Sequence, residues 1–237
     1  MRNISFCFLM HAPYRLKKYR FFDIGHDHYY YDDMQSEEHI GWLVQQSYMP
    51  LLGTIREMVN MSRGKFRCGL AVSGVTLEML EQFNPEVIDV MKELADSKAV
   101  EFVATPYGYS FAAEYAEGEF AHQLEREAAK IHELFGQKPT TLWNTELLYT
   151  DEIGDAVAKL GYKAVMLEGA KHLLSWKSPN YIYQSAAAKS LKLVMRNGAL
   201  SDEMQFHFSD PNWYNFPMDA EKYANQIAGI QGEEPVV

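Results

Sequence analysis

The fold class is most clearly indicated by residues 66–104, FRCGLAVSGVTLEMLEQFNPEVIDVMKELADSKAVEFVA. The apolar run 66–72 has the length of a buried strand, helical periodicity covers 76–82 and 85–96, and a second apolar run occupies 100–104. Asn84 and Pro85 suit the N-cap and the first position of the second helix. The order of strand, helix and strand predicts a parallel sheet with crossover helices.

The same alternation continues on both sides of this stretch. We expect further strands near residues 4–10, 141–143, 164–167, 181–184 and 191–195, and further helices over 40–60, 114–135, 151–160 and 219–227. About seven strands alternating with helices predict one α/β domain, residues 1–237, folded as a closed or nearly closed (β/α) barrel. An open doubly wound sheet is the alternative, although His11 and Pro13 stand where a nucleotide fold would place a Gly-x-Gly loop.

Composition excludes some classes of partner. The hydrophobic content of 47% can form a full core, and the net charge of −10 disfavours nucleic acid, because phosphate binding needs clustered Lys and Arg. The chain has no apolar run of about 18 residues, so we expect no membrane span. Cys7 and Cys68 both fall within predicted strands and read as free thiols, which favours a cytoplasmic protein.

Polar side chains gather where the predicted strands end, the edge at which barrel enzymes build their sites. Each of them alone is more often structural than catalytic, but together they supply a histidine, acids and an arginine. They are His11, Ser73, Thr105, Tyr107, Glu146, Glu168, Arg196 and Asp202. Glycoside cleavage needs two carboxyl groups, and Glu146 and Asp202 follow different strands, as such a pair would.

Other chemistries receive less support. The segment Gly25-His26-Asp27-His28 resembles a metal loop, but its tyrosine-rich surroundings favour a solvated surface loop, so we expect no metal and no cofactor. A serine elbow is absent and the cysteines lie mid-strand, which argues against a Ser or Cys nucleophile. Trp143 is either a platform for sugar stacking or barrel packing, and His11 either a donor to a sugar hydroxyl or a hydrogen-bonded strand end.

Four motifs in order resemble glycoside hydrolase family 57, in particular its bacterial α-amylase branch. They are His11-Ala12-Pro13; Val100-Glu101-Phe102 with Tyr107-Gly108-Tyr109-Ser110; Trp143-Asn144-Thr145-Glu146; and Arg196-Asn197 with Leu200-Ser201-Asp202. Leu167-Glu168-Gly169-Ala170 and the segment Trp176-Lys177-Ser178-Pro179-Asn180-Tyr181 are also typical of that branch. This chain departs from the family at Tyr109, where histidine is common, at Gly108, and at Asn197, which replaces an acid.

The resemblance implies an incomplete, seven-stranded (β/α) barrel and a retaining hydrolase of α-1,4-glucans. Glu146 would be the nucleophile and Asp202 the acid/base, and the α-glucan or maltodextrin would contact a surrounding set of side chains. That set is His11, Tyr107, Tyr109, Trp143, Glu168, Trp176 and Arg196. A C-terminal helical region usual in the family is expected to be missing.

Three alternatives stay open at this point. The same covalent intermediate passed to a glucan hydroxyl would make the protein a 4-α-glucanotransferase or branching enzyme. A non-catalytic glucan-binding relative is a second alternative, motivated by Tyr109. A deacetylase-like enzyme on a related barrel is the third, and it would need a bound metal.

Overall fold

The computed structural model describes residues 3–230 and 236–237, so residues 1–2 and 231–235 of the predicted domain lie outside the described part. Internal contacts divide the chain into two compact units. The N-terminal unit is Phe6–Thr145, and the C-terminal unit combines Met1–Ser5 with Glu146–Val237. That residues 1–237 form one domain stays a prediction.

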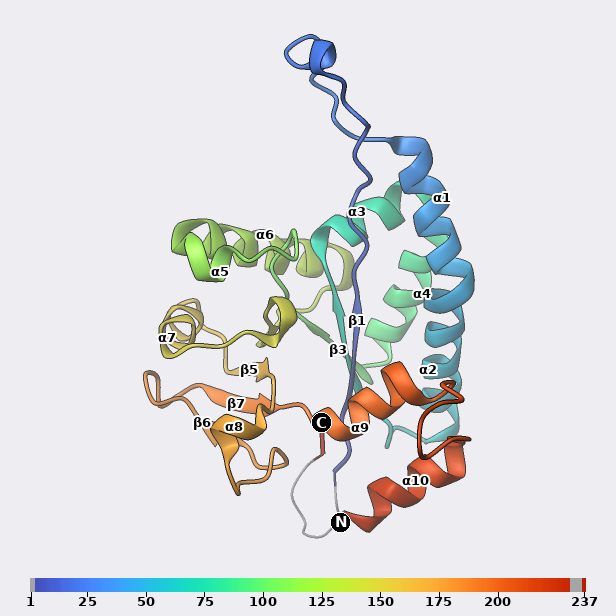
Figure 1. The fold of residues 1–237 in the computed structure, drawn as a ribbon, viewed down its shortest axis with the longest axis vertical. Coiled ribbons are helices and arrows are strands. Elements are labelled where there is room, and N and C mark those ends of the chain that lie inside the picture. Colours follow the sequence, from blue (N-terminus) through green and yellow to red (C-terminus); the bar gives the residue numbers. More distant parts are fainter. Residues whose placement is uncertain (1–2, 231–235) are drawn as a thin grey trace. The chain divides into compact units, whose positions relative to one another are not determined.

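The N-terminal unit is built on a parallel sheet (Figure 1). The strand β2 (Cys68–Val72) lies between β1 (Phe6–Met10) and β3 (Val100–Val103), and all three run in the same direction. A parallel bridge between Ala104 and Leu142 attaches β4 (Thr141–Trp143) to the end of β3. Because β1 and β2 end in register at Met10 and Val72, the residues that follow them leave the sheet at the same edge.

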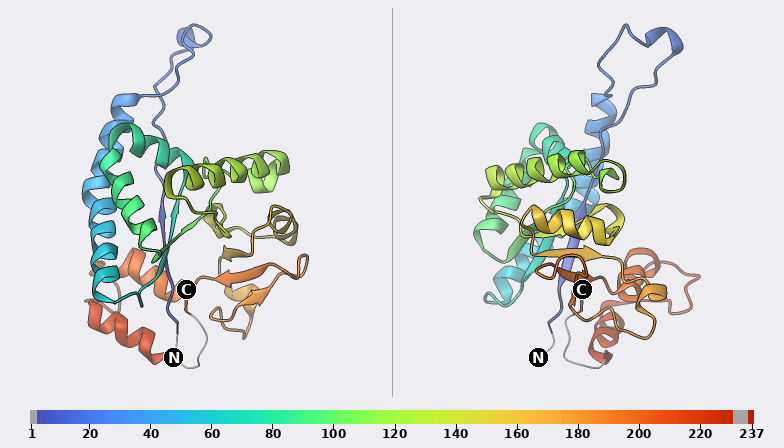
Figure 2. Two further views of the ribbon diagram at one scale, coloured as in Figure 1. Left: turned by 180° about the vertical axis from the view of Figure 1, so that it is seen from behind. Right: turned by 90° about the vertical axis from the view of Figure 1, so that its left-hand side faces the viewer.

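A long helical run flanks this sheet, as Figures 1 and 2 show. It consists of α1 (Asp33–Leu43), a π-helical turn (Val44–Tyr48) and α2 (Met49–Met61). The predicted helix 40–60 therefore starts too late. The missed signal is Asp32, whose side chain accepts a hydrogen bond from the backbone N–H of Gln35 at 3.0 Å and caps the helix.

The core lies where amphipathic helices meet the sheet. In α4 (Pro85–Asp96) the residues Val87, Ile88, Met91, Leu94 and Ala95 are buried, which is one continuous helical stripe. The helix α3 (Gly74–Phe83) packs against both α4 and α1. Within the described residues, no helix has the length and apolar character needed to cross a membrane.

The predicted helix 114–135 is two helices. The first is α5 (Ala112–Tyr115), and α6 (Glu117–Phe135) begins after Ala116, whose φ of −153° and ψ of 80° break the helical path. The longer helix ends at Gly136, which has a φ of +66° and provides the left-handed conformation that glycine adopts without strain. The ring of Phe135 stacks on that of Phe102 in β3 at 3.9 Å between centroids, which fixes the end of α6 on the sheet.

A hairpin-like arm, defined as residues 14–32, joins β1 to α1 and extends beyond the end of its own sheet (Figure 1). Its two sides are held by hydrogen bonds from the N–H of Lys17 to the oxygen of Tyr30 (2.9 Å) and from the N–H of Asp32 to the oxygen of Arg15 (2.8 Å). The short 3-10 helix η1 (Phe21–Asp23) forms its tip. The sequence predicts a solvated, aromatic surface loop here, whose tyrosines could contact substrate.

The sheet of the C-terminal unit mixes strand directions. In it β5 (Ala164–Leu167) pairs in parallel with β7 (Lys192–Met195), and β6 (Tyr183–Gln184) pairs antiparallel with β7. The expected parallel direction is found for β5 and β7 but not for β6. The connecting segment 185–191 is too short for the crossover that parallel neighbours require, so the chain turns back on itself.

The α-helices of this unit have ten residues or fewer. They are α7 (Asp151–Lys159), α8 (Lys171–Leu174), α9 (Gly198–Asp202) and α10 (Ala220–Gly229). Thr150 caps α7, because its hydroxyl accepts a hydrogen bond from the N–H of Ile153. The N–H of Ser5 donates to the oxygen of Val236 at 2.8 Å, and this pairing joins residues near both ends of the chain in one unit.

Candidate active site

Glu146 stands in an unusual backbone turn that opens the C-terminal unit. It lies in a short 3-10 turn, Thr145–Leu147, with a φ of +51°, and Leu147 follows with a φ of +56°. Two consecutive left-handed residues other than glycine are strained, and such backbone persists only where the surroundings hold it. Leu147 is buried whereas Glu146 is exposed, so the turn presents the carboxylate to solvent.

Asp202 is held by an arginine that bridges two acids. The Nη1 of Arg196 donates to Oδ1 of Asp202 at 2.9 Å, and its Nε donates to Oε2 of Glu168 at 2.5 Å. Partial burial disfavours the charged guanidinium, but the hydrogen bonds to Glu168 and Asp202 outweigh this and raise the pKa of Arg196. Three predicted site residues therefore form one contiguous group.

Backbone contacts bring these strand ends together. The N–H of Arg196 donates to the oxygen of Leu167 at 3.1 Å, and the N–H of Glu168 donates to the oxygen of Leu147 at 3.3 Å. Gly169 fits here because a Cβ at that position would lie 2.7 Å from the backbone oxygen of Arg196. Glu168 is thus connected to the Glu146 turn by a backbone hydrogen bond, and to Asp202 by the side chain of Arg196.

Asn197 explains one departure from the family motif. Its side-chain oxygen accepts from the N–H of Leu200 at 3.2 Å and so caps α9, the short helix that ends in Asp202. Its amide Nδ2 donates to Oδ1 of Asn180 at 3.1 Å. An acid could cap the helix in the same way but could not donate to Asn180, so the amide ties α9 to the 178–181 segment.

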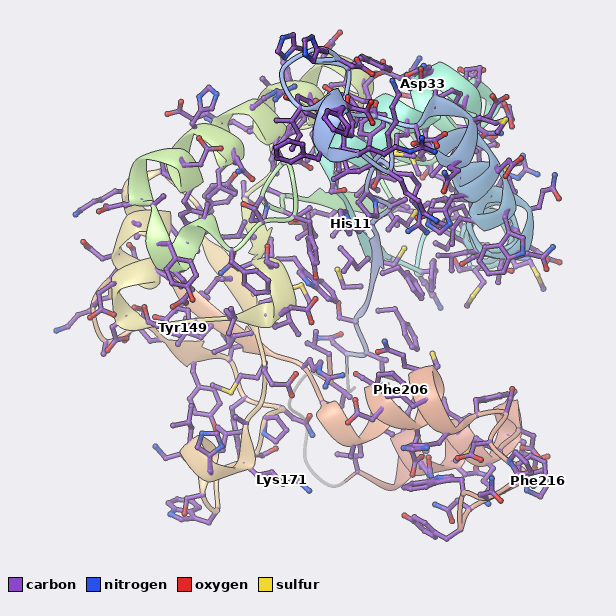
Figure 3. All side chains as sticks on the ribbon, turned by 45° about the horizontal axis from the view of Figure 1, so that its top comes forward. His11, Asp33, Tyr149, Lys171, Phe206 and Phe216 are labelled. Atoms are coloured by element: carbon purple, nitrogen blue, oxygen red, sulfur yellow. The ribbon has the colours of Figure 1, made fainter. Side chains whose placement is uncertain are left out.

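The N-terminal unit positions His11 at the end of β1 (Figure 3). Its Nδ1 is 2.8 Å from the hydroxyl of Ser73, which is itself 2.8 Å from the hydroxyl of Thr76. The ring packs against Tyr109 at 4.6 Å between centroids, and Tyr109 has a left-handed φ of +50°. Burial lowers the pKa of His11, which favours the neutral imidazole, able to accept a hydrogen bond at one nitrogen and donate at the other.

Tyr107 occupies a different place from its neighbour Tyr109. It is buried, its hydroxyl donates to Oε1 of Glu78 at 2.6 Å, and the guanidinium of Arg126 lies over its ring at 3.9 Å from the centroid. A Cβ on Gly74 would come within 2.2 Å of the same ring, so glycine is required there. Burial and the bond to Glu78 raise the pKa of Tyr107. The hydroxyl of Tyr107 is thus hydrogen-bonded to another side chain of the protein.

The two predicted tryptophans differ in exposure. Trp143 is the last residue of β4 and is half-buried, with its indole Nε1 lacking a hydrogen-bond partner among the residues described. Trp176 follows α8 and is 88% exposed, with its flat faces open to solvent. Their contact with substrate stays a prediction.

Several residues that contact the predicted site residues are not predicted from the sequence. Glu78 and Arg126 lie on helices and look like surface charges in the sequence, and Asn197 looks like a lost acid. Glu127 could have been found, because it occupies the buried stripe of α6 with Phe120, Leu124 and Ile131, where an apolar residue is expected. Among the described residues, no group of three or more His, Cys, Asp or Glu side chains is placed to hold a metal ion.

Comparison with known sequences points to one family. Residues 5–237 match the family model described as glycosyl hydrolase family 57. A protein of Methanocaldococcus jannaschii named "Putative alpha-amylase" is 34% identical over 236 residues, which are 97% of this chain and 49% of that protein. The chain therefore spans about half the length of this curated relative.

Two solved structures share the fold. A 4-alpha-glucanotransferase from Thermococcus litoralis has a TM-score of 0.67 at 16% identity, over 87% of this chain and 29% of that one. A branching enzyme from Pyrococcus horikoshii has a TM-score of 0.63 at 16% identity, over 100% of this chain and 56% of that one. These likenesses confirm the predicted fold class, an α/β, incomplete TIM-like barrel.

Proposed function

This chain belongs to glycosyl hydrolase family 57, and from that premise we propose that it cleaves α-1,4-glucans with retention through a covalent glycosyl-enzyme intermediate. Glu146 is the nucleophile and Asp202 the acid/base in this proposal. Its substrate is a maltodextrin or longer α-glucan. The free thiols Cys7 and Cys68 suit a reducing compartment, and a cytoplasmic location is part of the proposal.

One observation carries the assignment. Glu168 links the two carboxylates within a single compact unit: its N–H donates to the residue after Glu146, and its side chain binds the arginine that holds Asp202. A double displacement needs two carboxyl groups fixed relative to each other on different strand ends. Both acids remain accessible, since Glu146 is exposed and the side chain of Asp202 is 43% exposed.

The reaction would proceed in two balanced steps. The Glu146 carboxylate attacks the anomeric carbon, and the bond to the glycosidic oxygen breaks as Asp202 gives that oxygen its proton. Asp202, now ionised, then takes a proton from water, whose oxygen attacks the same carbon and releases Glu146.

The test is chemical trapping of the intermediate. A fluorinated α-glucosyl fluoride incubated with the protein should add one sugar mass to the peptide that contains Glu146. Glu146→Gln should show no labelling and should lose on the order of 10⁴-fold or more in maltodextrin cleavage. Labelling of another residue, or cleavage by Glu146→Gln at the wild-type rate, would overturn the assignment.

The second candidate is transfer rather than hydrolysis, and the structural likeness to a 4-alpha-glucanotransferase favours keeping it. Both reactions share the intermediate and differ in whether water or a glucan hydroxyl attacks it. The products distinguish them: hydrolysis of maltoheptaose yields only shorter chains, whereas transfer also yields longer or branched ones.

A further inference from the structure

Many aromatic side chains of the arm are exposed to solvent rather than packed in a core. Its 19 residues include seven aromatic rings, and Phe21 and Phe22 at the tip are 81% and 83% exposed. Tyr29, Tyr30 and Tyr31 on the returning side are also exposed. A concentration of exposed apolar side chains on one projection normally marks an interaction surface.

The rings are arranged in pairs along a fixed backbone. Tyr14 and Tyr31 are 5.2 Å apart between centroids near the base, Tyr19 and Tyr30 are 5.1 Å apart further along, and the two phenylalanines are 5.5 Å apart at the tip. The hydroxyl of Tyr19 donates to the backbone oxygen of Tyr29 at 3.0 Å. Figure 1 shows the arm projecting past the start of α1. The aromatic side chains of the arm are thus packed against one another in pairs along its length.

Charge on the arm points to a neutral occupant. Its four basic residues are nearly balanced by three acidic ones, and Lys17 pairs with Asp27 at 3.3 Å. Phosphate backbones and anionic lipid surfaces need a clear excess of cations, which this balance does not supply. A pyranose chain is neutral, offers apolar C–H faces to aromatic rings, and offers hydroxyls to tyrosine, aspartate and histidine side chains.

We propose that the arm is a second glucan-binding surface, separate from the Glu146 and Asp202 pair, that holds a stretch of polymeric α-glucan against its aromatic row. This inference rests on the proposed function for the identity of the polymer. A polymer that binds one protein at two surfaces has a higher apparent affinity than either surface alone provides, without a new catalytic contact. A trisaccharide gains nothing from the arm.

Binding is measured first, with soluble amylose as the probe and the whole chain carrying Glu146→Gln so that the probe is not consumed. Replacing Phe21 and Phe22 by Ala, and separately Tyr30 by Ala, should weaken retention on amylose about 5- to 50-fold. Tyr115→Ala is the matched control, because Tyr115 is 88% exposed in the same unit but lies on α5, outside the arm. Equal melting temperatures establish that the variants fold.

Turnover is measured second, in the background that retains Glu146. The arm variants should hydrolyse maltotriose at the wild-type rate and show a raised KM for amylose. Arm-dependent binding in a protein that cleaves no glucan would refute the proposed function and leave the inference standing.

Three results would overturn the inference. One is amylose retention that is the same for the arm variants and Tyr115→Ala. Another is a loss of activity on maltotriose equal to that on amylose. The third is a dimer, seen by sedimentation without glucan, that the Phe21 and Phe22 changes dissociate, because the arm would then bind a second copy of the chain.

Discussion

Replacing Glu127 with Gln should change how stability depends on pH. The Glu127 side chain is 0% exposed, and neither of its carboxyl oxygens meets hydrogen-bond geometry with a partner among the described residues. Burial raises its pKa well above the ordinary 4.5, although the nearby backbone N–H of Gly74 opposes part of that rise. The folded protein therefore holds this proton more tightly than the unfolded chain does.

The sign and size of the effect follow from that difference. As the pH rises above 4.5, the unfolded chain releases the Glu127 proton while the folded protein keeps it, so wild-type stability falls. The loss is at most about 1.4 kcal/mol per pH unit, and it stops once the pH exceeds the folded pKa. The Glu127→Gln variant has no such proton. Its buried amide costs about 1–3 kcal/mol, but this cost does not depend on pH.

The assay is urea unfolding of the whole chain from about pH 4.5 to 8 for wild type and Glu127→Gln, with each pair of free energies subtracted. The contributions of groups common to both proteins cancel in this subtraction. The free energy of unfolding of the variant minus that of wild type should therefore increase as the pH rises. Glu125→Gln, on the exposed face of the same helix, is the control and should show no such trend. Parallel profiles for wild type and Glu127→Gln would refute the reasoning.

Further changes test the packing around the proposed site and the helices. Arg196→Gln should lower kcat on maltoheptaose about 10- to 100-fold with little change in KM, because the guanidinium positions Asp202, which acts in the transition state. Arg196→Lys should recover part of the lost kcat. Gly169→Ala should destabilise by about 1–3 kcal/mol in urea unfolding, since its Cβ would meet the Arg196 oxygen. Gly53→Ala, inside α2 with nothing within 4 Å, should instead stabilise by about 0.5–1 kcal/mol in the same measurement. Asp219→Ala should lower the melting temperature by removing a 2.7 Å cap of α10, a loss of about 1 kcal/mol.

Periodicity predicts the parallel strands and long helices because burial of one face leaves a repeat in the sequence. The helix Pro85–Asp96 is predicted with both ends correct, since proline marks its start and the buried stripe its length. Strand β6 is assigned the wrong direction, because two residues carry no signal for pairing direction and only the short return to β7 decides it. The start of α1 is missed because Asp32 looks like a loop acid until its capping role is visible.

The site is predictable as a set of residue types but not as a set of contacts. The strand pattern places Glu168, Arg196 and Asp202 at strand ends, and the structure brings these three together through hydrogen bonds that depend on side-chain torsions. Tyr107 and Tyr109 are two positions apart and are treated alike by sequence reasoning, yet one is bound to Glu78 and the other packs on His11. The left-handed φ of Tyr109 separates them, and no residue nearby in the sequence signals it.

The pairing of Ser5 with Val236 decides how the protein can be divided for study. The N-terminal unit is one uninterrupted segment, Phe6–Thr145. The C-terminal unit is assembled from two segments, so a fragment that starts at Glu146 would leave the edge of Val236 without its partner. A fragment that carries residues 3–5 fused to it would again supply the hydrogen-bond partners of Val236.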